Sequence, residues 1–383
     1  MKKVFLGFLA ILTFLLVALS SCSSKDNEEN TDPEPPQKFE NDILTVFPDN
    51  QANIHGEVTI AGNSDQLLVC RGYFGGYVRA YNIEGREMTK NLDFKWENQD
   101  LSSVYKVVAL NDKDLVVDTW DKRKFFENNN GNWKSIPYES NLPNIIQNSP
   151  NTNLRIFGKH EALDGNFFVE GLPKHYITSL EEGVVIINEK IAGKWKFKEY
   201  IQAPDGNSQD YFGSYVAIKG KSLLIGAPGR DKNGEDAGAA YYYELDNNTW
   251  ILKKTLFGAT GNRSFGTSVA IGSDYLYVGS SGNAPSVKVY DKVTFSPIYS
   301  RTDTDNFNFA DYMTCFNDFL YVKDDERLNV YKTNSDLSRI VRYLPTKYQY
   351  DNSGYAFGDQ VAVFPNMVIT SGSNGGKCFI YYK

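Results

Sequence analysis

The segment FGSYVAI at residues 212–218, followed by LLIGAP at 223–228, decides the fold of this chain. A second copy comes next, with FGTSVAI at 265–271 and LYVGS at 276–280. Each copy places a glycine after a phenylalanine, then an apolar run, then a second apolar run that ends in small residues. A unit that recurs at a regular interval indicates a repeat architecture.

Weaker copies extend the repeat along the chain at intervals of roughly 50 residues. The second run of a copy is followed by a loop and by a third run rich in aromatic residues, as in AAYYY at 239–243 and VKVY at 287–290. A fourth run often opens on a tryptophan, as at Trp133, Trp195 and Trp250. The seven copies start, in order, at His55, Val104, Phe157, Phe212, Phe265, Phe309 and Phe357.

Four short runs of β-branched and aromatic residues, separated by Gly, Asn and Asp turns, predict a four-stranded antiparallel sheet in each copy. Such a sheet cannot bury both faces alone, so seven copies predict an all-β, seven-bladed β-propeller. The last copy lacks a fourth run, and LTVF at 44–47 supplies one from the other end of the chain. We therefore expect the N-terminal strand to join the last blade and to close the ring, which removes exposed sheet edges. An open array or a sandwich is the alternative.

The repeats resemble FG-GAP repeats, the units of the integrin α-subunit propeller and of many bacterial extracellular proteins. Residues 212–213 and 226–228 match both halves of the motif, and residues 265–266 with 279–280 nearly do so. The resemblance implies a propeller over residues 41–383. Integrin-type repeats often carry a calcium loop between the first and second strands, but here those connections are too short to supply several oxygen ligands. We expect no metal site of that type.

The loop DKNGED at residues 231–236 is a separate candidate for calcium. Its Asp-x-Asn-Gly core partly resembles a calcium loop, but it lacks the downstream glutamate and one early oxygen ligand. Asp, Asn and Gly also form ordinary turns. We interpret the loop as a turn and keep calcium binding as the alternative.

The N-terminus resembles that of a bacterial lipoprotein. Residues 1–3 are MKK, residues 4–19 are mostly apolar, and LSSC at 19–22 follows. This layout predicts a signal peptide over residues 1–21. LSSC resembles the lipobox, which implies that Cys22 becomes the acylated first residue of the mature protein. A signal peptide with a chance cysteine, or an anchor helix, is the alternative.

Residues 22–40 are polar and rich in proline and acidic residues, which predicts a disordered tether between the lipidated cysteine and the propeller. Acidic residues directly behind Cys22 resemble the export signal of lipoproteins that some Gram-negative bacteria display on their surface. We therefore expect the protein to be lipid-anchored in the outer membrane and to face the cell surface. A generic linker, with the protein on the periplasmic face, is the alternative.

The composition limits the classes of partner and the redox chemistry. The net charge of −7 argues against a nucleic-acid partner, which would require a basic stripe. Cys70, Cys315 and Cys378 all fall within predicted strands, so we expect buried thiols rather than disulfides.

The sequence offers little support for catalysis. It has three histidines, of which His55 and His160 fall at or near repeat starts and His175 lies in a long loop, where we expect a solvated side chain. It contains no nucleophile elbow, zinc spacing or phosphate loop, so we expect neither an enzyme nor a cofactor. Paired carboxylates of the glycosidase type cannot be recognised this way, because the two partners come from distant positions.

A ligand site is expected on one face of the ring. The loops that join strands two and three of a blade share this face with the loops that lead from strand four to the next blade. Aromatic, acidic and arginine side chains there could bind a glycan or form the polar rim of a protein interface. The main candidates are Arg71, Tyr73, Trp120, His175, Tyr211, Arg230 and Asp231, with Asp118, Asp121, Asp205, Asp210, Asp303, Lys323, Asp324, Tyr350 and Asp351 as further members.

We therefore interpret the chain as a surface-anchored, non-catalytic module that binds a protein or a glycan. One alternative is an enzyme that acts on polysaccharide, a lyase or hydrolase, because propellers also host such enzymes. Another is a structural subunit of a cell-envelope complex.

Overall fold

The computed structural model describes the strands of seven sheets and most of the turns that connect them. Residues 1–40, which include the expected signal peptide, Cys22 and the tether, lie outside the described residues. The described part of the chain contains no helix that is long and apolar enough to cross a membrane. Described are residues 41–45, 58–71, 77–91, 95–96, 104–119, 123–130, 132–144, 160–175, 181–261, 263–282, 284–302, 309–317, 319–323, 328–333, 337, 339–343, 357–372 and 377–382.

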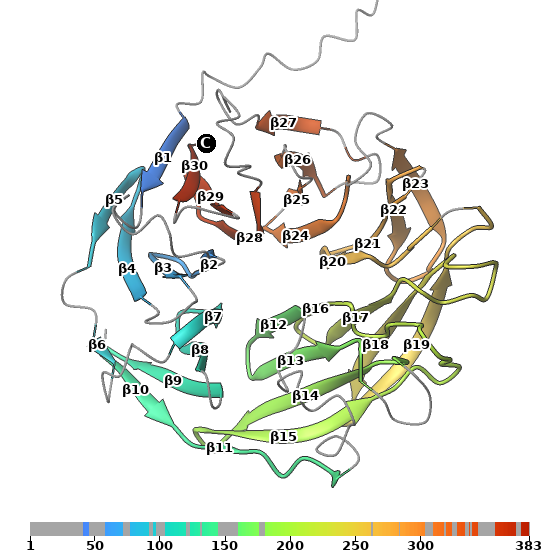
Figure 1. The fold of residues 1–383 in the computed structure, drawn as a ribbon, viewed down its shortest axis with the longest axis horizontal. Coiled ribbons are helices and arrows are strands. Elements are labelled where there is room, and N and C mark those ends of the chain that lie inside the picture. Colours follow the sequence, from blue (N-terminus) through green and yellow to red (C-terminus); the bar gives the residue numbers. More distant parts are fainter. Residues whose placement is uncertain are drawn as a thin grey trace, which may run out of the picture. The chain divides into compact units, whose positions relative to one another are not determined.

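Residues Phe39–Lys383 form one compact unit, a seven-bladed β-propeller, as the repeats predict (Figure 1). Blade 1 contains β2 (Val58–Gly62), β3 (Gln66–Arg71), β4 (Tyr77–Glu84) and β5 (Glu87–Lys90), and blade 2 contains β7 (Val104–Leu110), β8 (Asp114–Thr119), β9 (Arg123–Asn129) and β10 (Asn132–Ile136). Blade 3 contains β12 (His160–Asp164), β13 (Phe167–Leu172), β14 (Val184–Ile191) and β15 (Lys194–Ile201). Blade 4 contains β16 (Tyr215–Lys219), β17 (Ser222–Ala227), β18 (Ala239–Asp246) and β19 (Thr249–Phe257).

Blades 5 to 7 repeat the same antiparallel order. In the sheet of blade 7, β1 pairs antiparallel with β30, from Asn41 opposite Tyr381 to Thr45 opposite Lys377. Blade 5 contains β20 (Ser268–Ile271), β21 (Tyr275–Ser280), β22 (Ser286–Asp291) and β23 (Pro297–Thr302). Blade 6 contains β24 (Tyr312–Phe316), β25 (Phe319–Lys323), β26 (Leu328–Lys332) and β27 (Arg339–Tyr343). The sheet of blade 7 contains β28 (Phe357–Val363), β29 (Met367–Gly372), β30 (Lys377–Tyr382) and β1 (Asn41–Thr45).

Two blades have a fifth strand that the repeats do not predict. The two-residue strands β6 (Lys95–Trp96) and β11 (Tyr138–Glu139) pair in parallel with the outermost strands β10 and β15. Both belong to the connections that lead into blades 2 and 3, and both lie opposite a tryptophan, Trp133 and Trp195. Such short additions carry no periodic signal, so the expectation of four strands is wrong for these two blades.

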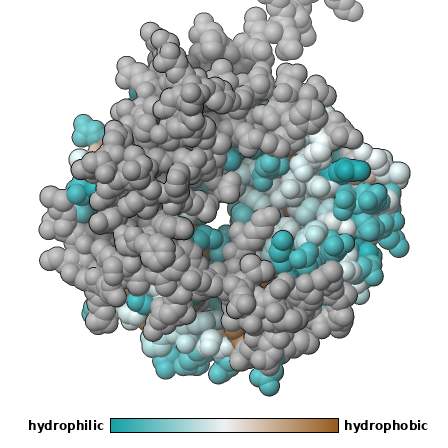
Figure 2. All heavy atoms as spheres, in the orientation of Figure 1, coloured by the Kyte–Doolittle hydropathy of each residue, from teal (hydrophilic) through white to brown (hydrophobic). Residues whose placement is uncertain are grey.

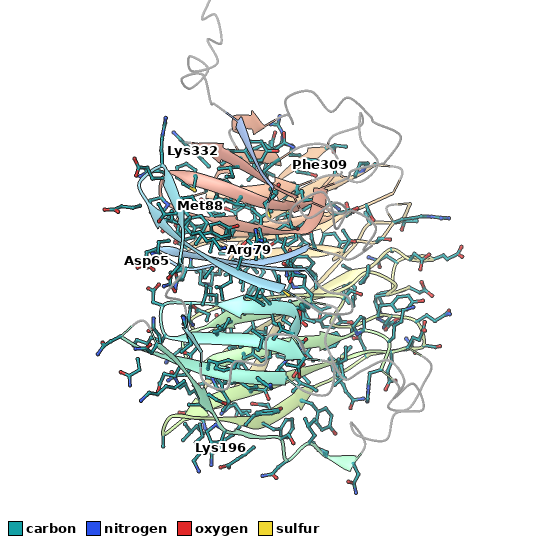
Figure 3. All side chains as sticks on the ribbon, turned by 60° about the vertical axis from the view of Figure 1, so that its left-hand side comes forward. Asp65, Arg79, Met88, Lys196, Phe309 and Lys332 are labelled. Carbon is teal, nitrogen blue, oxygen red and sulfur yellow. The ribbon has the colours of Figure 1, made fainter. Side chains whose placement is uncertain are left out.

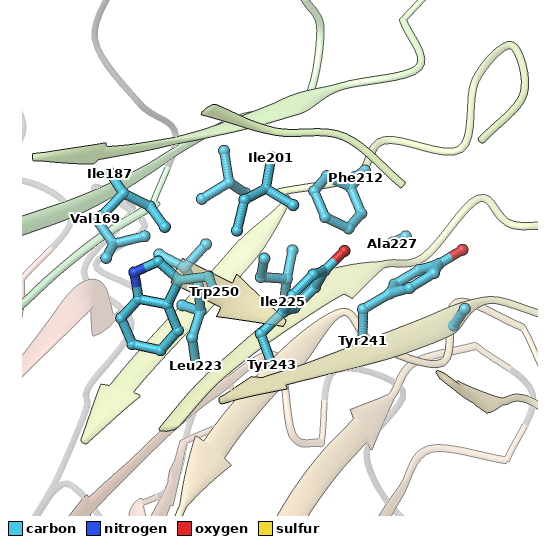
Figure 4. Close-up of a cluster of buried hydrophobic side chains, with 13 residues drawn as sticks. Val169, Ile187, Ile201, Phe212, Leu223, Ile225, Ala227, Tyr241, Tyr243 and Trp250 are labelled. Atoms are coloured by element: carbon cyan, nitrogen blue, oxygen red, sulfur yellow. The ribbon is translucent and has the colours of Figure 1, made fainter. Parts of the chain in front are cut away.

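Neighbouring blades bury one another's faces, and this packing forms the core. The largest cluster lies between blades 3 and 4, where Phe212 packs edge-on against Tyr241 with ring centroids 5.2 Å apart (Figure 4). Side chains fill the space between the sheets, whereas charged side chains such as Lys196 project from the outer strands (Figure 3). The innermost strands of blades 7 and 1, β28 and β2, contact each other, and the Ile60 amide donates to Gln360 Oε1 at 2.5 Å.

The Phe-Gly and Gly-Ala elements meet at the blade interfaces. Gly213 and Gly266 have φ of 88° and 92°, which glycine adopts without strain. The Gly213 amide donates to the Gly226 carbonyl of the same blade at 2.9 Å. A Cβ atom on Gly226 would lie 2.0 Å from the carbonyl oxygen of Gly266 in the next blade. The motif glycines therefore let the backbones of adjacent blades approach one another directly.

The expected free thiols are present. Cys70 in β3 and Cys378 in β30 are buried and Cys315 in β24 is partly buried, and none of the three forms a disulfide. Burial raises the pKa of each thiol to about 12. These thiols are therefore protonated and unreactive at neutral pH.

Replacing Gly226 tests the close approach of the blades. The Gly226→Ala variant is expected to lose about 3 kcal/mol of stability, because the added methyl group overlaps a backbone carbonyl that only a blade movement can relieve. Gly220→Ala is the matched control, since it meets no atom within 4 Å and has a left-handed φ of 57°, which costs about 1 kcal/mol. Urea unfolding measures the free energy of unfolding of both variants. Equal losses of stability would contradict the close approach of the blades at Gly226.

Closure of the ring by β1 remains a prediction, which a deletion can test. Removing residues 41–45 exposes the edge of β30 and is expected to lower the Tm by about 5 °C or more, because a whole strand pairing is lost. Deleting residues 26–35 from the expected tether serves as the control and should leave the Tm unchanged. An unchanged Tm after removal of β1 would show that the ring does not depend on this strand.

Candidate functional site

The two predicted classes of loop meet at Arg230. This residue lies in the loop between β17 and β18, and its Nη2 donates to Asp205 Oδ2 at 3.0 Å. Arg230 Nε lies 3.6 Å from Asp210 Oδ2. Asp205 and Asp210 both belong to the loop that leads from β15 to β16, so one guanidinium joins the two loop classes. We call Asp205, Asp210, Arg230 and Tyr241 the Arg230 cluster.

Hydrogen bonds from several elements fix this cluster. The Tyr241 hydroxyl, on β18, donates to Asp205 Oδ1 at 2.8 Å. The Asn207 amide donates to Asp210 Oδ2 at 2.7 Å. The Gly229 amide donates to the carbonyl of Asp210 at 3.2 Å. The side chains of Arg230 and Asp210 are 8% and 1% exposed, whereas that of Asp205 is 39% exposed. Only Asp205 of the cluster's carboxylates reaches solvent.

The pKa values of the two carboxyl groups in the cluster are shifted in opposite directions. Burial raises the pKa of Asp210 to about 6, although the Asn207 amide and Arg230 partly offset this effect. Burial also acts on Asp205, but the hydrogen bonds from Tyr241 and Arg230 outweigh it and hold the pKa of Asp205 below its ordinary value. Burial would lower the pKa of Arg230, yet the nearby carboxylates keep it raised. Arg230 and Asp205 are therefore charged at neutral pH.

Tyr211 and Asp231 form the rim beside the cluster. Tyr211 has a left-handed φ of 55°, and its amide donates to the Glu181 carbonyl in the loop between β13 and β14 at 3.2 Å. Asp231 is exposed, and its Oδ1 accepts a 2.7 Å hydrogen bond from the Asp236 amide. The loop at residues 231–236 thus folds as a turn. Among the described residues no group of three or more acidic, histidine or cysteine side chains has the arrangement of a metal site.

The remaining candidate site residues are either buried or lie wholly or partly outside the described part of the structure. His175 is buried rather than solvated, because its amide and carbonyl close the loop through bonds to Leu172 and Gly183. Lys323 and Asp118 are also buried. Arg71 ends β3, but its side chain lies outside the description. Tyr73, Trp120, Asp121, Asp303, Asp324, Tyr350 and Asp351 lie outside the described residues.

Asp118 belongs to a buried ionic network between blades 2 and 3 that sequence reasoning missed. Arg123 binds Asp118 through Nε at 2.7 Å and Nη2 at 3.0 Å, binds Glu161 at 3.3 Å, and contacts Glu170. Lys106 Nζ adds a 2.8 Å ion pair to Glu161. Burial raises the pKa of Glu170 despite the attraction of Arg123. These charges link blade 2 to blade 3, and all of them except Lys106, whose side chain is 20% exposed, are buried.

Aromatic side chains from three blades pack together where the innermost strands begin. The rings of His160 and Tyr215 stack with centroids 3.5 Å apart, and Tyr312 lies 5.9 Å from Tyr215. The Tyr215 hydroxyl donates to the Met313 carbonyl at 2.8 Å, which links blade 4 to blade 6. Each of the three occupies the fourth position of its repeat, counted from Phe157, Phe212 and Phe309, and this shared position is the signal that could have revealed them. In the view of Figure 2, the centre of the ring shows an opening with hydrophilic residues beside it.

One of the comparisons with known proteins covers the region of the Arg230 cluster. The family model of the FG-GAP repeat matches residues 195–243, which include Arg230, Asp205, Asp210 and Tyr241. No curated protein matches the chain. Among solved structures, BamB from Moraxella catarrhalis is similar, with a TM-score of 0.46, 11% sequence identity and 85% of each chain covered.

The pKa of Asp210 gives a test of the cluster. Because the folded pKa of about 6 lies above the ordinary value of 3.8, the protonated carboxyl stabilises the fold below about pH 4, and this contribution is lost as the pH rises through 6. The free energy of unfolding of Asp210→Asn, relative to that of the wild type, should therefore rise by up to about 3 kcal/mol from pH 4 to pH 7.5. Urea unfolding across this range measures the change, with exposed Asp65→Asn as the control. Parallel pH profiles for Asp210→Asn and the wild type would contradict the assignment.

Proposed function

We propose that the protein is a lipid-anchored binding protein of the outer membrane that faces the cell surface and binds a protein or glycan without catalysing a reaction. The binding surface is the loop face beside the Arg230 cluster, with Tyr211 and Asp231 at its rim. The observation that carries the proposal is the convergence of both loop classes on one guanidinium. Such cross-linked loops form a rigid platform, which lowers the entropic cost of binding.

The charges of the platform favour recognition over catalysis. A general acid or base must reach the substrate, but the side chain of Asp210 is 1% exposed. Asp205 reaches solvent, yet both of its oxygens are occupied, one by Tyr241 and one by Arg230. The pair of carboxylates therefore serves to hold Arg230 and the loops in place.

The groups at the rim, where Tyr211 is partly exposed, define the kind of ligand. Tyr211 offers a phenol ring on the rim, and Asp231 is joined by the exposed side chains of Lys232 and Glu235. An aromatic ring among carboxylates can pack against the apolar face of a sugar while the carboxylates accept hydrogen bonds from its hydroxyls. The same groups can form the polar rim and the aromatic anchor of a protein interface.

The anchor rests on the sequence of the first 40 residues. Acylation of Cys22 with more than one chain would hold the protein at a membrane durably. The polar tether at residues 22–40 would then space the propeller from the bilayer. Surface display would expose the loop face to extracellular glycans and proteins.

Binding assays on a panel of glycans and cell-surface proteins test the proposal. We expect at least one ligand, and we expect Tyr211→Ala combined with Asp231→Lys to weaken its binding at least about tenfold, because both groups lie at the rim of the expected contact. Asp65→Lys is the matched control, since Asp65 is exposed in a turn between β2 and β3. The absence of any ligand, equal binding by the rim variant, or product release from a polysaccharide would contradict the proposal.

A further inference from the structure

The hairpin that joins β22 to β23 carries an apolar patch at the outer edge of blade 5. Five large apolar side chains of the described residues are exposed, and three of them, Val293, Ile298 and Tyr299, belong to this hairpin. Val293 is 84% exposed, and Pro297 is exposed beside them. Single exposed apolar side chains are ordinary, whereas a cluster of them marks an interaction surface. We call Val293, Pro297, Ile298 and Tyr299 the apolar hairpin.

The tip of the apolar hairpin is fixed in one conformation. Asp291 Oδ1 accepts hydrogen bonds from the amides of Val293 and Thr294 at 3.0 and 2.6 Å. The Phe295 amide donates to the Asp291 carbonyl at 2.9 Å, and the Phe295 ring lies 5.5 Å from that of Tyr242 in blade 4. These contacts hold Val293 away from the sheet, so its side chain stays open to solvent.

The outermost strand of blade 5 also differs from those of blades 3 and 4 at its bulge. The register shifts in these three blades leave one residue of the outermost strand without a partner, namely Lys198, Lys253 and Ile298. A lysine on an edge strand opposes association, because its charge would have to leave water. Blade 5 has an exposed isoleucine at this position instead. Its outer edge therefore lacks the protection of its neighbours.

The chain enters the propeller at the same end of the blades. β22 and β30 are the third strands of their sheets, and both run toward this end, where they finish at Asp291 and Tyr382. β1 pairs antiparallel with β30, with Asn41 opposite Tyr381, so β1 begins there. Residues 22–40 therefore join the propeller at the end that carries the apolar hairpin, opposite to the loop face.

The expected tether limits how far this end can lie from a membrane. Residues 22–40 span roughly 25 Å as a flexible chain and about 65 Å at full extension. A propeller anchored through Cys22 is thus confined to the neighbourhood of the bilayer, where a weak apolar contact is enough to orient it. The inference rests on the proposed lipid anchor.

We propose that the apolar hairpin dips into the bilayer beneath the anchored protein, so that the loop face points away from the membrane. Val293 and Ile298 enter the boundary between headgroups and acyl chains, and Tyr299 lies at the level of the headgroups, which suits its amphipathic ring. Removal of these side chains from water drives the contact. The fixed turn presents them without a cost for ordering.

The charges beside the hairpin make a neutral bilayer sufficient. Glu244, Asp274 and Asp291 line the space next to Val293 between blades 4 and 5, together with Lys253 and Lys292. The carboxylates outnumber the ammonium groups, so anionic headgroups are not attracted to this surface. We therefore expect the contact to be insensitive to salt, unlike a contact between opposite charges.

Fluorescence quenching in vesicles tests the proposal. The protein is purified from membranes of cells that express the full chain, with the fluorescent amino acid dansylalanine at position 293 or, on the loop face, at position 231. It is reconstituted into phosphatidylcholine vesicles that carry a doxyl spin label on the acyl chains. We expect quenching at position 293 to be at least three times that at position 231, and to stay the same in high salt.

A charge at the tip tests the role of the apolar side chain. With dansylalanine at position 298, Val293→Asp should lower the quenching at least twofold, because a carboxylate resists entry into the bilayer. The matched control is Asn247→Asp, which places the same charge at the exposed tip of the hairpin between β18 and β19 in blade 4. We expect it to leave the quenching at position 298 unchanged.

The possible outcomes separate the contact from the anchor. Equal quenching at positions 293 and 231 in acylated protein, or unchanged quenching in Val293→Asp, would overturn the contact and leave the proposed function standing. A blue-shifted emission at position 293 without quenching would place a second copy of the chain on the hairpin and would overturn it too. Mass spectrometry of the N-terminal peptide reports acylation of Cys22 separately, and its absence would refute the anchor and the contact together.

Discussion

The close approach of glycine backbones between neighbouring blades is the constraint on which the rest of the propeller depends. A side chain at Gly226 has no room, because the Gly266 carbonyl of the next blade occupies its place. The same contact occurs one blade earlier, where a Cβ atom on Gly171 would lie 1.9 Å from the Gly213 carbonyl. This repeated contact sets the spacing of blades 3 to 5. As a result, the loops that lead into each blade lie beside the loops of the blade before it, and Arg230 can reach Asp205 and Asp210.

The fold could be predicted because its signals are local and repeated. The Phe-Gly elements of blades 4 and 5 have left-handed glycines, and the strands alternate or bury apolar residues, so the blade register follows from the sequence. The site was predicted only in part, since the pairing of Arg230 with Asp205 depends on which loops meet. His175 was assigned to solvent because a single loop residue carries no sign of the hydrogen bonds that fold its loop inward. The aromatic contact of His160, Tyr215 and Tyr312 was missed because it joins three blades.

Buried and exposed charges have different roles in this molecule. The network around Arg123 and the inner part of the Arg230 cluster are closed to solvent and act between loops or blades. Breaking such pairs leaves an uncompensated buried charge, which is costly. The charges that remain open lie at the two ends of the blades, around Asp231 at one end and Lys292 at the other.

Site-specific photocrosslinking on intact cells tests the central claim most directly. A benzophenone amino acid is introduced into the full chain at Tyr211, on the loop face, or at Ile191, which is exposed at the opposite end of blade 3. The account predicts a discrete crosslinked product from position 211 and none from position 191. Crosslinking from position 191 alone, or none from position 211, would contradict the assignment of the loop face as the binding surface.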